Sequence, residues 1–185
     1  CSSDLKKTDL IALVLILIAL VSVRVFFNIP NFNPVGAIAL MSGMILGRKM
    51  IAWIVPFALI ILGDFALGLS SPIHSDYFLS SYSVFVYLSF GITIGIGVLL
   101  TKRLSVSSTL LGSFIAAVAF FLITNAGSWL MMPEYSKDIT GLITSYKMGL
   151  PFFRATLLSQ IIFSSIIYGV YHVVTKRKVE FSKVS

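Results

Sequence analysis

Asp64 is the acidic residue that lies well inside an apolar segment of this sequence, within Leu62-Gly63-Asp64-Phe65. A carboxylate is costly in lipid, so such a residue usually faces a cavity or pairs with another polar group. Arg24 and Arg154 are expected at a similar depth, and either could be its counter-ion. Two interpretations remain open: contact with a substrate or ion, and a buried ion pair that joins helices.

Three further polar residues lie in or beside apolar segments. Asn125 can both donate and accept hydrogen bonds. Trp129 could stack on a flat ligand, although anchoring at the membrane interface is the more common role of a tryptophan there. Gln160 would face inward, where a hydrogen bond between helices is a sufficient explanation. The predicted substrate-binding set combines all of these with one residue before the second span: Asn33, Asp64, Asn125, Trp129, Arg154 and Gln160.

The sequence contains no motif that predicts catalysis. It has no HExxH, no G-x-S-x-G and no phosphate-binding loop, so metalloprotease, serine hydrolase and ATPase chemistry are not indicated. His74 and His172 are far apart, and no cluster has metal-ligand spacing. We therefore expect no catalytic residue, no metal, no cofactor and no enzymatic activity.

The elements that must position these side chains are membrane helices. Of 185 residues, 57% are hydrophobic and 11% charged, against roughly a quarter charged in soluble domains. This composition excludes a soluble enzyme, a disordered tail and a nucleic-acid binder. We expect a single integral membrane domain, residues 1–185, in the lipid bilayer. Because lipid offers no hydrogen bonds to the backbone, the fold should be all-α.

Apolar runs predict six transmembrane helices in a bundle, at about 10–27, 34–46, 51–69, 82–100, 108–131 and 150–174. The second span is short. Longer polar connections are expected at 28–33, 70–81 and 132–149. Ala39, Gly43 and Gly47, and likewise Gly91 and Gly95, have the four-residue spacing that lets helices approach closely. That spacing serves either internal packing, which is favoured, or docking of another subunit.

The basic residues predict the orientation of the bundle. Ten of the fourteen Lys and Arg residues fall on one side, in both terminal segments and in the turns after spans 2 and 4. Since cytoplasmic segments are enriched in Lys and Arg, both termini should be cytoplasmic, in the bacterial inner membrane. Cys1-Ser2-Ser3-Asp4 resembles the start of a mature lipoprotein. An acylated Cys1 would lie on the outer face of the membrane. Because the charges place the amino terminus in the cytoplasm, they favour a Cys1 that is not acylated.

Several strings resemble an uncharacterised bacterial integral-membrane family described only as transport proteins. They are residues 31–40, Asp64 with Gly68, Thr124-Asn125 with Trp129, Gly141-Leu142, and 150–153 with Thr156-Leu157. Arg154 stands where that family usually has Asn, and Ser159-Gln160 where it has Gly-Asp.

More distantly, the layout is similar to the S components, or substrate-binding subunits, of energy-coupling-factor (ECF) transporters. Those are six-helix proteins, and Gly47, residues 63–68 and Pro151-Phe152 resemble features of their helices. The resemblance implies a vitamin-like small-molecule substrate taken from the external side. It also implies a transmembrane coupling subunit with cytoplasmic ATPases as partners.

Two functions follow as hypotheses. The first is a substrate-binding membrane subunit of a transporter, which predicts an external cavity lined by the six residues above. The alternative is a non-catalytic accessory or structural subunit of a larger membrane complex. That alternative predicts a tightly packed bundle without a cavity.

Overall fold

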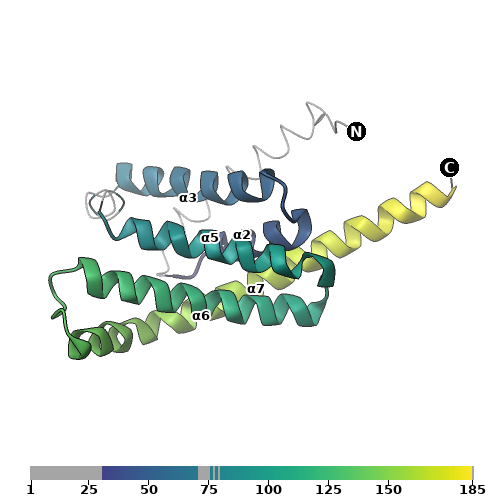
Figure 1. Cartoon of the computed structure of the whole chain (residues 1–185). Coiled ribbons are helices and arrows are strands. Elements are labelled where there is room, and N and C mark those ends of the chain that lie inside the picture. The colour runs from purple at the N-terminus through teal and green to yellow at the C-terminus, as the bar shows by residue number, and fades with distance from the viewer. Residues whose placement is uncertain (1–30, 71–75, 77, 79, 185) are drawn as a thin grey trace.

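The computed structural model describes residues 31–70, 76, 78 and 80–184, and the elements in this part of the chain are helices (Figure 1). They are α2 (Val35–Leu46), α3 (Ile51–Ser70), α5 (Ser83–Leu100), the 3-10 helix η1 (Thr101–Arg103), α6 (Val106–Met131) and α7 (Ile139–Val184). The expected all-helical class therefore holds for the described residues. The predicted span 10–27 lies outside them.

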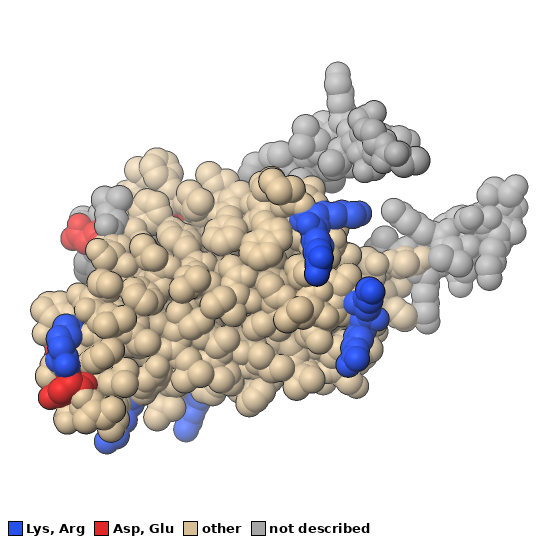
Figure 2. All heavy atoms as spheres, viewed as in Figure 1, with Lys and Arg blue, Asp and Glu red and all other residues tan. Residues whose placement is uncertain are grey.

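Four of these helices are long and apolar enough to cross a membrane, in the segments 51–69, 83–103, 106–131 and 139–173. Their outer faces are apolar, and Leu69 and Leu99 are 76% and 82% exposed. In Figure 2 the middle of the visible face carries no acidic or basic side chain. These features suit a lipid bilayer, whereas the count of six spans and the side of each terminus stay predictions.

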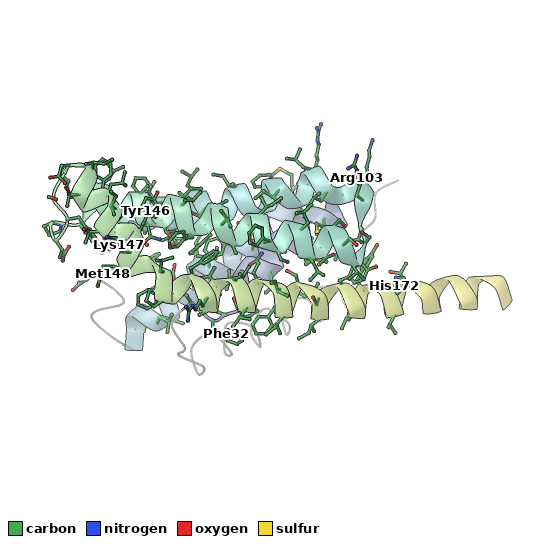
Figure 3. The ribbon with its side chains drawn as sticks, turned by 90° about the horizontal axis from the view of Figure 1, so that it is seen from below. Phe32, Arg103, Tyr146, Lys147, Met148 and His172 are labelled. Carbon is green, nitrogen blue, oxygen red and sulfur yellow. The ribbon has the colours of Figure 1, made fainter. Side chains whose placement is uncertain are left out.

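Two basic connections lie together at one end of the bundle. The chain turns after α2 at Gly47, whose φ of 64° favours glycine. The Thr101 hydroxyl at the start of η1 donates to the carbonyl of Gly43, 3.0 Å away, so the two connections are neighbours. We call residues 47–50 and 101–105 the basic end. Figure 3 shows Arg103 at this end, beyond which α7 continues past His172.

Side-chain caps fix where α6 and α7 begin. Ser105 and Ser108 form a reciprocal capping box at the start of α6. The Asp138 carboxylate accepts a 2.8 Å hydrogen bond from the Gly141 backbone N–H, so α7 begins at Ile139. The polar stretch that we expected to form a connection over 132–149 is therefore helical from Ile139 onward, and Pro151 lies inside the helix.

α2 is the central helix and packs against α3, α5, α6 and α7. Leu40, Met41 and Met44 are at most 1% exposed. Gly43 of α2 and Gly97 of α5 lie where the two backbones meet, because a Cβ on either would clash with the carbonyl oxygens of Ile94 and Leu40 respectively. Small residues at a membrane helix interface permit this close approach.

The short length of α2 limits how much of the bundle centre this helix can fill. Twelve residues rise about 18 Å, against about 30 Å for the hydrocarbon core of a bilayer. α2 ends at the basic end, and its first residue, Val35, packs beside Phe90, midway along α5. α2 therefore fills the centre of the bundle over only part of the length of α5.

The contact between α2 and α5 gives a test with a matched control. Gly97→Ala places a methyl group against the α2 backbone and should destabilise the protein by about 1–3 kcal/mol, as overpacking does. Gly95→Ala is the control, because nothing lies within 4 Å of its Cβ position. Unfolding of both variants in one detergent measures the effect. Equal stability of the two variants would contradict the close approach.

Candidate functional site

A cavity of about 470 Å³ lies in the half of the bundle away from the basic end. Its walls are the first half of α5, the second half of α6 and the part of α7 from Met148 to Thr156. Asn31 and Asn33, which precede α2, and Asp64 of α3 also line it. The cavity thus occupies the region beyond the first turn of α2. Its volume is within the range of about 300–1,000 Å³ that is usual for small-molecule sites.

Asp64 is the carboxylate of this cavity. It is half-buried on α3, and the hydroxyl of Tyr87 on α5 donates to its Oδ2 at 2.9 Å. A hydrogen bond to a charged acceptor is stronger than one between neutral groups and fixes its direction. The Tyr87 hydroxyl therefore holds Asp64 in place across the interface between α3 and α5.

Amide side chains supply further polar groups to the cavity wall. The Asn33 side-chain oxygen accepts from the Val35 backbone N–H at 3.1 Å, which ties it to the start of α2. The Asn125 amide nitrogen donates to the Phe121 carbonyl at 2.8 Å, one turn earlier in α6. Gly149 of α7 lies against the Asn125 side chain, leaving no room for a Cβ. Asn33 and Asn125 are thus held in defined positions.

Aromatic rings form much of the remaining wall. The lining includes nine: Phe78, Tyr82, Tyr87, Phe90, Phe120, Phe121, Tyr135, Phe152 and Phe153. Phe90 and Phe120 meet edge to face with their centroids 5.3 Å apart, and Phe121 and Phe153 are 5.0 Å apart. Such pairs are favoured by the ring quadrupoles. The rings therefore form cavity walls that have a defined shape.

The connection from 132 to 138 borders the cavity through Met132 and Tyr135. The Trp129 indole N–H donates to the Ser136 carbonyl at 2.9 Å. The Lys137 ammonium donates to the carbonyls of Trp129 and Met132, each 2.6 Å away. These bonds fold the connection back onto the end of α6. Trp129 thus positions the border of the cavity without lining it.

Three of the six residues in the predicted binding set line the cavity together, and three do not. Asn33, Asp64 and Asn125 line it, whereas Trp129, Arg154 and Gln160 are outside the lining. Arg154 is exposed on α7. The counter-ion alternative Arg24 is outside the described residues.

Gln160 is buried in the interior of the bundle, at 4% exposure. Its side-chain nitrogen donates to the carbonyl of Gly36 at 3.2 Å, and its backbone carbonyl accepts from the Ser113 hydroxyl at 3.4 Å. Gln160 therefore joins α7 to α2 and α6, the structural role that helix–helix hydrogen bonding predicts. By holding the first turn of α2, it helps to set where the cavity begins.

A comparison with protein-family models matches residues 4–183 to a family of unknown function (DUF6580). The chain belongs to this family. A search of curated proteins and a search of solved structures found no significant match. For this DUF6580 member, the resemblance to transport proteins and to ECF S components therefore stays a prediction.

The aromatic part of the lining in this DUF6580 protein was not predicted from the sequence. The signal was present as helical spacing: Phe121, Asn125 and Ser128 are three or four residues apart and share one face of α6. Tyr87 and Phe90 repeat the pattern on α5. Aromatic residues are frequent throughout this sequence, with 15 Phe and 7 Tyr. The helical spacing is therefore noticeable only when it is counted from a residue already chosen for another reason, such as Asn125.

The cap at Asp138 leads to a test of how the cavity border is held. The Gly141 backbone N–H and then the Ser136 hydroxyl donate to this carboxylate and lower its pKa below the ordinary value of 3.8. Asp138→Ala removes the acceptor, so amide exchange over residues 139–143 should rise on the order of fivefold. Asp138→Asn keeps an acceptor and is the control. Hydrogen exchange measured by mass spectrometry reports both.

The pH dependence has a definite sign. Folding lowers the pKa of Asp138. The stabilisation that the Asp138 carboxylate gives to the start of α7 is therefore complete above pH 3.8, and it is lost as the pH falls through the pKa of Asp138 in the folded state. Protection of residues 139–143 should follow this course in the wild-type chain and be absent in Asp138→Ala. Unchanged exchange in Asp138→Ala would show that the carboxylate does not cap α7.

Proposed function

We propose that this protein is the substrate-binding membrane subunit of a transporter and captures a small organic molecule in the cavity beside α2. The observation that carries the proposal is the cavity itself, which combines aromatic walls with a few fixed polar groups. This combination is usual for small-molecule sites, where apolar walls supply contact area and polar groups supply specificity. A bundle that served only as an accessory subunit would have no need of such a cavity.

The direction of capture follows from the charges. The cavity lies away from the basic end, where Arg48 and Lys49 neighbour Lys102 and Arg103. Connections rich in Lys and Arg lie on the cytoplasmic side in most membrane proteins. The proposal therefore places the cavity toward the external side of the bacterial inner membrane, with both termini in the cytoplasm.

The proposal includes partners. Membrane transport by alternating access commonly involves one rigid body moving against another around the binding site. A transmembrane coupling subunit would be the second body here, with cytoplasmic ATPases as the source of energy. A binding role is favoured over catalysis because the described lining has one carboxylate and no His, Cys or Lys.

The first test asks whether the cavity holds a molecule. Thr156→Phe adds a ring inside the cavity, and Thr144→Phe is the matched control. Both threonines are on α7 and donate to the carbonyl four residues earlier, but Thr144 is exposed and outside the lining. Each chain is expressed, purified in mild detergent and denatured, and the released small molecules are identified by mass spectrometry.

The wild-type chain and Thr144→Phe should release the same compound, and Thr156→Phe should lose at least about nine-tenths of it, corresponding to a tenfold weaker binding or more. Size-exclusion profiles verify that both variants are folded. Capture of a small molecule would be contradicted if the wild-type chain released no more compound than Thr156→Phe.

The second test concerns the partners. A tagged chain is purified from its native membrane in mild detergent, and the co-purifying proteins are identified. Recovery of two ATPases with one membrane coupling protein is the expected result. Recovery of an unrelated membrane complex in fixed proportion would instead support the accessory-subunit alternative.

A further inference from the structure

We infer that a different membrane protein docks on the outer face of α7 around Arg154, through a transmembrane helix that carries an aspartate or glutamate near the middle of the bilayer. Arg154 is exposed on α7. Thr156, which lines the cavity, follows two residues later and lies about 200° round the helix. Leu150 and Leu158, one turn to either side of Arg154, are 53% and 55% exposed. The docking face thus points away from the cavity, and the inference does not rest on the function proposed above.

The depth of Arg154 follows from two hydrogen bonds between α6 and α7. The Ser145 hydroxyl donates to the carbonyl of Asn125 at 3.1 Å. Fifteen residues further along α7, the Gln160 carbonyl accepts from the Ser113 hydroxyl at 3.4 Å. The two helices are therefore antiparallel. Since Arg154 lies between these two contacts, it is level with the middle of α6.

The middle of α6 is also the middle of the apolar part of the bundle. By this register Arg154 is level with residues 116–119, at least about 15 Å from either end of α6 at about 1.5 Å per residue. The charged residues Arg103 and Glu134 lie just beyond the two ends of α6. The hydrocarbon core of a bilayer extends about 15 Å to each side of its middle. A long side chain reaches the interface from near a helix end, and Arg154 is far from both ends.

A guanidinium at this depth requires a partner. Arginine within a membrane span is rare and pairs with an acid or faces a water-filled cavity in almost every case. Among the described residues, none forms a hydrogen bond or an ion pair with the Arg154 side chain. The predicted span 10–27, which is outside the described residues, contains Arg24 and no acid. Lipid headgroups lie at the two surfaces of the bilayer. The partner is therefore a carboxylate on another membrane protein.

A second copy of this chain does not provide that carboxylate. Of the seven acidic residues in the sequence, Asp64 is the one in a segment apolar enough to span a membrane. Gly127 of α6 lies against Phe85 of α5. Tyr87, two residues further along α5, donates to Asp64. Asp64 is thus level with about residue 125 of α6, about 9 Å or more from the depth of Arg154, and it belongs to the cavity wall.

The experiment is photo-crosslinking of the full chain in its native membrane. The photoreactive residue p-benzoyl-phenylalanine replaces Leu158, one turn from Arg154 on the docking face. The matched control carries it in place of Leu62, which is 51% exposed about midway along α3. α2 packs between α3 and α7, so the control position is on another side of the bundle (Figure 1). The joined peptides are sequenced by mass spectrometry.

We expect the probe at position 158, and not the probe at position 62, to join a different membrane protein. The joined peptide should lie in an apolar segment of about 20 residues, with an Asp or Glu within two helical turns, about 11 Å, of the joined residue. Joining to lipid alone, to a second copy of this chain, or to a segment without an acid would overturn the inference.

Charge variants test the ion pair itself. Arg154→Leu should lose at least about nine-tenths of the joined protein on co-purification, as a tenfold weaker association does. Lys147→Leu is the control, because Lys147 is an exposed cation on the same face, seven residues closer to the start of α7. Arg154→Glu should also lose the partner, and changing the identified partner acid to Lys should restore it. Full retention of the partner by Arg154→Leu overturns the inference.

Unfolding of the isolated chain in detergent separates docking from a structural role. Because Arg154 is exposed, Arg154→Leu should unfold at the same temperature as the wild-type chain or higher. A lower unfolding temperature would show that Arg154 stabilises this chain from within, which contradicts docking. Compound release is unaffected by this substitution if capture holds, so the cavity and the docking face are tested independently. A coupling subunit and an accessory complex would equally satisfy this inference.

Discussion

The short central helix is the constraint on which the rest of this structure depends. A membrane bundle must exclude lipid and satisfy every backbone polar group, which favours long helices packed around a filled centre. α2 has only twelve residues and ends at the basic end of the bundle. α2 therefore fills the centre of the bundle over only part of the bundle's length, and the surrounding helices line a cavity of about 470 Å³ over the rest. The cavity is a consequence of helix length.

Two contacts fix the position of that short helix. Gly43 and Gly97 allow α2 and α5 to approach until their backbones touch, and Gln160 holds the carbonyl of Gly36 near the other end of α2. With α2 fixed at both ends, the boundary between the packed and the open part of the bundle is also fixed. Asp64 and Tyr87 then join α3 to α5 on the open side, where a polar pair can reach the cavity.

Much of the fold was predictable from the sequence, because apolar runs long enough to cross a membrane have few alternatives to a helix. Asn33, Asp64 and Asn125, which line the cavity, could be singled out for a related reason: a polar side chain beside an apolar run usually turns toward other protein groups. Arg154 and Trp129 show the limit of that argument. A long side chain can instead lie on the outer surface of its helix, as exposed Arg154 does on α7, and the Trp129 indole donates to the carbonyl of Ser136.

The remaining features depend on how helices are rotated and paired, which one sequence does not determine. The spacing of Gly91 and Gly95 suggested a helix contact, yet Gly97 is the α5 residue that meets α2, and nothing lies within 4 Å of the Cβ position of Gly95. The start of α7 at Ile139 depends on one cap, Asp138, inside a stretch of polar residues that equally suits a loop. The aromatic wall needs three helices in register before it can be recognised.

The central claim is that this cavity opens toward the outside and can be reached there by a small molecule. The most direct measurement places a thiol on its wall, by Ser128→Cys in a chain whose single native cysteine is removed by Cys1→Ser. Intact cells are treated with a membrane-impermeant methanethiosulfonate that carries a sulfonate group. The account predicts that the Ser128→Cys thiol is labelled from outside. Labelling only after the membrane is opened would contradict it.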